Sequence, residues 1–286
     1  WVLPYGQWQF AVCGIIGILT AIAFLFITQY YTSGTYRPVR EIAEQSRRGV
    51  ATNMISGLSI GMETTGLPAI VISAALLSSY YVGKSVEFPT DAAISAGIFG
   101  TAVATMGMLM SAAYILAMDT FGPITDNAGG IVEMSNQPES VREITDALDS
   151  VGNTTKALTK GYAVGTAALA AFLLFSAFLE EVNRFKGAGN EVARVVNVAE
   201  PRVFVGGLIG AMIVFLFTSL AIRAVGNAAG DMIEEVRRQF KADPGIMAGT
   251  SLPDYARCVD ISVRSALREM ILPGILAVAG PVIVGT

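Results

Sequence analysis

The sequence is dominated by six long stretches that contain no charged side chain. Each supplies roughly the 20 apolar residues that a helix needs to cross a hydrocarbon core of about 30 Å, the last one barely so. Backbone polar groups in lipid must pair within their own segment, so runs of this length predict helices rather than barrel strands. The sequence therefore predicts an all-α, polytopic transmembrane helix bundle with six spanning helices. The six stretches are residues 1–36, 64–83, 92–118, 161–179, 203–222 and 270–286.

The rest of the composition agrees with a membrane protein. Charged residues make up 15% of the chain and hydrophobic residues 53%, which is unlike a soluble globular domain. No separate soluble domain is evident. Because the sequence begins without a methionine and stops within an apolar stretch, residues 1–286 are interpreted as a partial transmembrane domain of a longer protein. Small residues recur at close helical spacing in "SAGIFGTAVATMGMLMSAA" and "GGLIGAMIVFLF", which predicts that neighbouring helices approach closely there.

Lysine and arginine residues divide unevenly between the connections. The connections after the first, third and fifth spans hold fourteen of them, and the other two hold five. The positive-inside rule therefore predicts that the first set faces the cytosol. The two cysteines, Cys13 and Cys258, are predicted to lie at different depths, so no disulfide is expected. The chain has no histidine, so acid–base or metal chemistry must use carboxylates, amides, lysines and water.

The third connection, residues 119–149, is strongly acidic. It holds seven carboxylates and one base, Arg142. Hard oxygen donors at this density suit Mg²⁺, and a solvated acidic loop without a metal is the alternative. Asp119 and Asp126 lie seven residues apart, so they share a helix face if the third span continues past Pro123, which can kink it.

A capping pattern follows within the same connection. Ser140 and Glu143 have the spacing of a capping box, which predicts the start of a short helix. Gly152 is then expected to end that helix.

A polar stripe opens the fourth span. Asn153, Lys156 and Lys160 fall at positions i, i+3 and i+7 of one helix face. Asn153 is a favoured N-cap residue, so the stripe is expected to begin where free N–H groups can bind a phosphate. Two lysines near lipid call for an anionic partner: the acidic connection, a bound phosphate, or acids on helices outside this chain. Alternatively, both lysines extend to the lipid headgroups. The segment is not a nucleotide P-loop, because the glycine directly before the lysine and the preceding strand are missing.

At these residues the sequence resembles the membrane-bound, ion-translocating inorganic pyrophosphatases. The resemblance covers nearly the whole chain and implies a homodimer of sixteen-helix subunits, to which this chain supplies roughly helices nine to fourteen. The matching stretches are "YYTS" (30–33), "GPITDNAGG" (122–130), "TDALDSVGNTT" (145–155), "KGYAVGTAAL" (160–169), "EEVRRQF" (234–240) and "PDYARCVDIS" (253–262).

The resemblance also implies roles for individual residues. It implies that Asp126 is a Mg²⁺ ligand, that Asn153 contacts both metal and substrate, and that Lys160 binds pyrophosphate. Asp119 lies near them in the family's pattern. Asp119, Asp126 and Lys160 are therefore the candidate catalytic residues.

Two further positions point to a subclass of the family. Potassium-dependent members carry alanine at the position of Lys156, whereas potassium-independent members carry lysine there, with threonine at the position of Thr159. The resemblance therefore implies a potassium-independent, proton-pumping member, in which the ammonium of Lys156 stands in for K⁺.

The implied function is Mg²⁺-dependent hydrolysis of pyrophosphate coupled to proton translocation out of the cytosol. The implied partners are pyrophosphate, the lipid bilayer and a second subunit, with no nucleic acid. The implied location is a multi-pass protein of the membrane, the inner membrane in a bacterium, with a cytosolic active site. Several motifs of the family would lie outside residues 1–286, so this chain alone is expected to be inactive. A secondary anion transporter lined by the lysine stripe is the alternative, and a purely structural bundle leaves that stripe unexplained.

Overall fold

The computed structural model describes residues 6–87, 95–186 and 196–285 of the chain. All regular elements in these ranges are α-helices, with no strand, which confirms the all-α prediction. Within these ranges, five helices are long and apolar enough to cross a membrane, or six if a pair bent by 42° is taken as one span. This agrees with six predicted spans. The chain divides into two units, residues 1–193 and 194–286.

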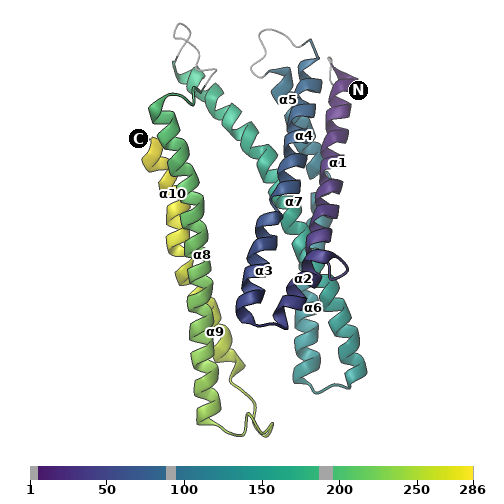
Figure 1. Cartoon of the computed structure of the whole chain (residues 1–286), viewed down its shortest axis with the longest axis vertical. Coiled ribbons are helices and arrows are strands. Elements are labelled where there is room, and N and C mark those ends of the chain that lie inside the picture. The colour runs from purple at the N-terminus through teal and green to yellow at the C-terminus, as the bar shows by residue number, and fades with distance from the viewer. Residues whose placement is uncertain (1–5, 88–94, 187–195, 286) are drawn as a thin grey trace. The chain divides into compact units, whose positions relative to one another are not determined.

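The first unit holds seven helices among its described residues (Figure 1). Helices α1, α4 and α5 run side by side, while α6 and α7 form a long hairpin. The elements are α1 (Gln7–Thr32), α2 (Arg37–Ser46), α3 (Val50–Glu63), α4 (Gly66–Lys84), α5 (Ala96–Leu109), α6 (Ala112–Met134) and α7 (Glu139–Lys186).

Small residues bring α1, α4 and α5 into close contact, as the first small-residue stretch predicts. A Cβ atom added to Gly100 of α5 would lie 2.6 Å from the carbonyl oxygen of Ser79 in α4. One added to Gly107 would collide with the backbone of Gly14 in α1. The glycines of the second stretch, which lie in the other unit, have no atom within 4 Å of such a Cβ among the described residues. Close packing there therefore stays a prediction.

The core of this unit attaches α7 to α1 and α5. Phe24, Met108 and Leu169 are fully buried in one apolar cluster. The hydroxyl of Tyr162 donates a hydrogen bond of 2.7 Å to the carbonyl oxygen of Met108. Gly165 leaves the space that Phe24 and Met108 occupy. This packing fixes the middle of α7, so the part of α7 that precedes it is held in a defined position.

The acidic connection is mostly helix, which corrects the expectation of a loop with a short helix. Helix α6 continues through Pro123 to Met134, and α7 then runs for 48 residues without a break. At 1.5 Å per residue α7 is about 72 Å long, more than twice the hydrocarbon thickness. The prediction that a helix ends at Gly152 is therefore wrong, and Asn153 lies inside a helix rather than at an N-cap. Ser140 likewise lies within the first turn of α7 rather than before it.

The second unit consists of α8 (Pro201–Ala242), α9 (Tyr255–Glu269) and α10 (Ile271–Gly285) within its described residues. Helices α9 and α10 both pack along α8. Two of the family-like stretches meet here, because Gln239 of α8 both donates to the carbonyl oxygen of Asp254 (3.1 Å) and accepts from its N–H (2.8 Å). The buried carboxylate of Glu235 pairs with Arg238 and Arg257. These contacts hold the start of α9 against α8.

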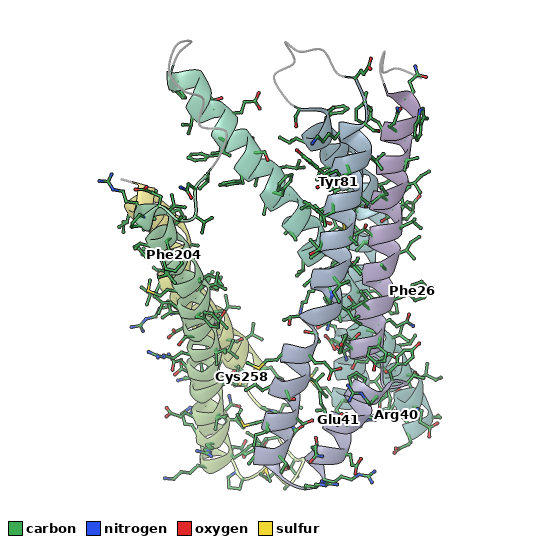
Figure 2. The ribbon with its side chains drawn as sticks, turned by 45° about the horizontal axis from the view of Figure 1, so that its top comes forward. Phe26, Arg40, Glu41, Tyr81, Phe204 and Cys258 are labelled. Atoms are coloured by element: carbon green, nitrogen blue, oxygen red, sulfur yellow. The ribbon has the colours of Figure 1, made fainter. Side chains whose placement is uncertain are left out.

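Large apolar side chains cover the outer surfaces of the helices. Phe26 on α1 and Tyr81 on α4 are 67% and 62% exposed (Figure 2). Such exposure is expected where a helix faces lipid or a further helix.

Candidate functional site

Two glycines allow α6 and α7 to approach each other closely. A Cβ atom on Gly152 would lie 3.0 Å from the Cα atom of Gly122 and would collide with the hydroxyl of Thr125. That hydroxyl is buried and donates 2.8 Å to the carbonyl oxygen of Gly122. Gly152 therefore serves helix contact rather than helix termination, which explains why the sequence-based prediction was wrong.

The close approach gathers four polar side chains, which we call the hairpin cluster: Asp126, Asp149, Asn153 and Lys156. The ammonium of Lys156 forms an ion pair with Asp126 across the two helices. It also lies 3.5 Å from Oδ1 of Asn153. The amide of Asn153 donates a 3.0 Å hydrogen bond to Oδ2 of Asp149. Asn153 thus links Asp149 to Lys156, so the four side chains form one connected group.

Asp149 is the member of the cluster that the sequence analysis did not single out. Its Oδ1 atom is buried and has no hydrogen-bond partner among the described residues. A buried carboxylate oxygen without a donor is costly unless a cation or a donor reaches it. Asp149 lies four residues before Asn153 and seven before Lys156, so extending the polar stripe backwards by one turn would have found it.

The side chain of Lys156 lies against the neighbouring helix. It is 24% exposed, and its ammonium is turned toward Asp126 on the neighbouring helix. The acidic segment is thus the anionic partner that the sequence called for, at least for this lysine.

The remaining predicted site residues lie outside these contacts. Lys160 is exposed and forms no ion pair with another described residue, and Asp119 is half-buried without a hydrogen bond or ion pair in the described ranges. Thr159 is buried, and its hydroxyl lies within donating distance of the carbonyl oxygens of Ile115 and Thr155, each at 3.2 Å. Asp119 and Asp126 lie on one continuous helix, so the condition under which they share a helix face is met.

Comparison with known proteins decides the family. A family model described as inorganic H⁺ pyrophosphatase matches residues 1–286. The chain belongs to this family. Over 272 residues, it is 60% identical to the K(+)-insensitive pyrophosphate-energized proton pump 2 of Moorella thermoacetica, a match that covers 95% of this chain and 39% of that protein.

Two further relatives show the same pattern. A K(+)-insensitive pyrophosphate-energized proton pump of Caldanaerobacter subterraneus is 58% identical over 95% of this chain and 38% of that protein. The pyrophosphate-energized membrane proton pump 3 of Arabidopsis thaliana is 55% identical over 99% of this chain and 35% of that protein. The chain thus spans less than two fifths of the length of each of these curated relatives. Its family and its apolar helices together show an integral, multi-pass membrane protein.

Membership of a pyrophosphatase family implies a divalent metal, and the hairpin cluster is the place to test the fit. No group of three or more His, Cys, Asp or Glu residues suited to a metal occurs within the described part of the chain. The cluster does offer two carboxylates and an amide oxygen, and one carboxylate oxygen of Asp149 has no partner. Hard cations such as Mg²⁺ are commonly bound through one or two carboxylates together with water and phosphate oxygens. These oxygen atoms therefore fit part of the ligand set of such a metal site.

Proposed function

We propose that the complete protein containing this chain hydrolyses inorganic pyrophosphate and couples the reaction to proton transport out of the cytosol. The observation that carries the proposal is the hairpin cluster, which combines carboxylates for a metal with an ammonium for balancing charge. The family to which the chain belongs and the printed names of its relatives support it. The secondary anion transporter is less well supported, because the ammonium of Lys156 pairs with Asp126 instead of facing an open path.

In this proposal the residues of the hairpin have different roles in binding the metal and the substrate. Asp126, Asn153 and Asp149 hold Mg²⁺, and bound Mg²⁺ neutralises charge on the phosphate oxygens. Asn153 also contacts the substrate, and the exposed Lys160, one turn beyond Lys156, binds the pyrophosphate oxygens. Asp119 lies two turns before Asp126 on α6 and belongs to the same catalytic region. Holding the substrate in register and stabilising its charge are the main contributions of such a site.

The subclass assignment rests on Lys156 and Thr159. The ammonium of Lys156 lies against the carboxylate of Asp126, where it supplies the positive charge that a free K⁺ would otherwise bring. The hydroxyl of Thr159 already donates to backbone carbonyl groups. Its role in this proposal is therefore to hold α7 in place, so that Lys156 keeps its position.

The proposed function is tested with the complete protein in sealed, inside-out membrane vesicles. Adding pyrophosphate with Mg²⁺ is expected to release phosphate and acidify the vesicle lumen, without any K⁺. Removing Mg²⁺ with a chelator should stop both signals, and an uncoupler should abolish the acidification alone. Phosphate release without any lumenal acidification would contradict the pump, and no phosphate release would contradict the hydrolase. A homodimer, also part of the proposal, is checked by the mass of the purified protein.

The orientation of the hairpin is proposed from the charge distribution. Within the first unit, α2 with its charged residues Arg40 and Glu41 lies at the same end as the tip of the α6–α7 hairpin (Figures 1 and 2). The other end carries Lys84, at the end of α4. In the whole chain, the connections assigned to the side of the hairpin hold fourteen basic residues and the other connections hold five. The positive-inside rule therefore favours a cytosolic position for the hairpin end.

Cysteine labelling checks this orientation. A cysteine introduced at Lys84 of the complete protein, in a background without native cysteines, is expected to react with an impermeant maleimide in intact cells. A cysteine at Glu143, an exposed residue of the hairpin, should react after the membrane is permeabilised. Labelling at 143 in intact cells would reverse the proposed orientation.

A further inference from the structure

The stem of Lys156 lies across Gly122 of the opposite helix. A Cβ atom added to Gly122 would come within 2.5 Å of Cγ and 2.7 Å of Cδ of Lys156, and closer still to Cε. The three nearest atoms to this missing side chain all belong to Lys156. The stem of Lys156 therefore occupies the space that a side chain at position 122 would fill.

The clash cannot be relieved by moving the end of the lysine alone. The position of Cγ is set by χ1, the first rotatable bond of the side chain. A methyl group at position 122 would therefore force the whole side chain into another rotamer. The ammonium would then leave Asp126, its present partner.

Gly122 and Asp126 act on the same lysine from one face of α6. They are four residues apart, so one lies directly above the other on the helix. Gly122 accommodates the methylene groups, and Asp126 receives the ammonium. The side chain is 24% exposed, so most of the stem is shielded from water between the helices.

We propose that Gly122 is a positioning residue that determines potassium independence by directing the Lys156 ammonium to the carboxylates of the hairpin cluster. The inference rests on the proposed function, in which that ammonium replaces K⁺. It predicts that a methyl group at position 122 has the same effect as loss of the lysine charge: the site becomes short of one cation, and a free K⁺ can fill it.

Gly122 also lies close to Gly152. The test must therefore distinguish an effect on the path of the lysine from an effect on the distance between α6 and α7. A Cβ atom on Gly152 would meet Thr125 and the backbone of Gly122, and Lys156 is not among its three nearest atoms. Gly152→Ala thus disturbs the spacing without blocking the stem. Gly129 lies on the same helix with no atom within 4 Å of an added Cβ, so Gly129→Ala is a matched control for the gain of a methyl group in α6.

The test measures phosphate release by the complete protein in membranes, with KCl or with choline chloride at equal ionic strength. For Gly122→Ala, activity in choline chloride is expected to fall by about tenfold, within the range of interactions between contacting residues, and KCl should restore most of it. Gly129→Ala should match the parent in both salts. Gly152→Ala should lose activity equally in both salts. Parental activity of Gly122→Ala in choline chloride, or equal recovery with choline and K⁺, would overturn the proposal.

A double variant keeps the test decisive if Gly122→Ala is inactive in every salt. With Lys156→Ala in the same chain, the stem no longer needs the space over Gly122. Gly122→Ala/Lys156→Ala is therefore expected to show the same K⁺-dependent activity as Lys156→Ala. A double variant that is inactive in KCl while Lys156→Ala is active would mean that Gly122 serves packing alone, and the inference would fail. The parent and Lys156→Ala, measured in parallel, report separately on the proposed function.

Discussion

Replacing Asp126 by alanine in the complete protein is expected to lower pyrophosphate hydrolysis by about a hundredfold or more, the scale seen when a preorganised charge is removed from a reaction centre. Two effects combine. The variant loses an oxygen ligand proposed for Mg²⁺, and it leaves the partly buried ammonium of Lys156 without its ion-pair partner. That ammonium would then face the metal position directly, so like charges would oppose metal binding.

Comparison with a second acid on the same hairpin makes this result specific. Asp146 is exposed, and its nearest charged partner is Arg142, at 3.7 Å. Asp146→Ala should therefore keep the parental rate, because it removes an acid of the same segment without touching the hairpin cluster. Phosphate release is measured in membranes and normalised to the amount of protein detected by immunoblot. Parental activity of Asp126→Ala at normal abundance would remove Asp126 from the site.

The spanning segments were predictable from sequence because lipid imposes a simple rule. An uncharged run long enough to cross the bilayer must form a helix. The five or six candidate spans in the described part of the chain agree with the six predicted runs. The water-exposed part of the chain follows no such rule. Gly152 carries the local signal of a helix end, but its contact with Gly122 on α6 keeps it inside a continuous helix. Tertiary contact overrode a local propensity there.

The candidate site was predictable in part for the same reason. The stripe of Asn153 and Lys156 follows from helical spacing, and the structure places Lys156 against Asp126 and beside Asn153. The neighbour Asp149 is missed because the sequence predicts that the helix begins at Asn153, which places Asp149 in another element. Thr159 shares the helix, yet its hydroxyl faces the carbonyl oxygen of Ile115, and no sequence pattern could show which side of α7 would be covered.

The second large effect is expected for Lys156→Ala, which should create a requirement for K⁺ in a protein that otherwise needs none. Removing the ammonium leaves the carboxylate of Asp126 without its cation, and it frees the place of the ammonium beside that carboxylate, which a monovalent ion can occupy. Activity in K⁺-free buffer is expected to fall by about tenfold, and added K⁺ should restore most of it. The measurement is phosphate release at increasing KCl, with choline chloride keeping ionic strength constant.

The choline series matters because any salt screens exposed charges, whereas a binding site distinguishes between cations. A saturable response to K⁺ that choline does not reproduce would identify a site, and a response common to both would identify screening. Arg142→Ala is the matched control, since Arg142 is a basic residue of the same hairpin that pairs with Glu133 instead of the hairpin cluster. It should remain independent of K⁺. If Lys156→Ala keeps full activity without K⁺, or recovers equally with choline, the ammonium of Lys156 does not stand in for K⁺ and the subclass assignment fails, while the effect of Asp126→Ala would still stand.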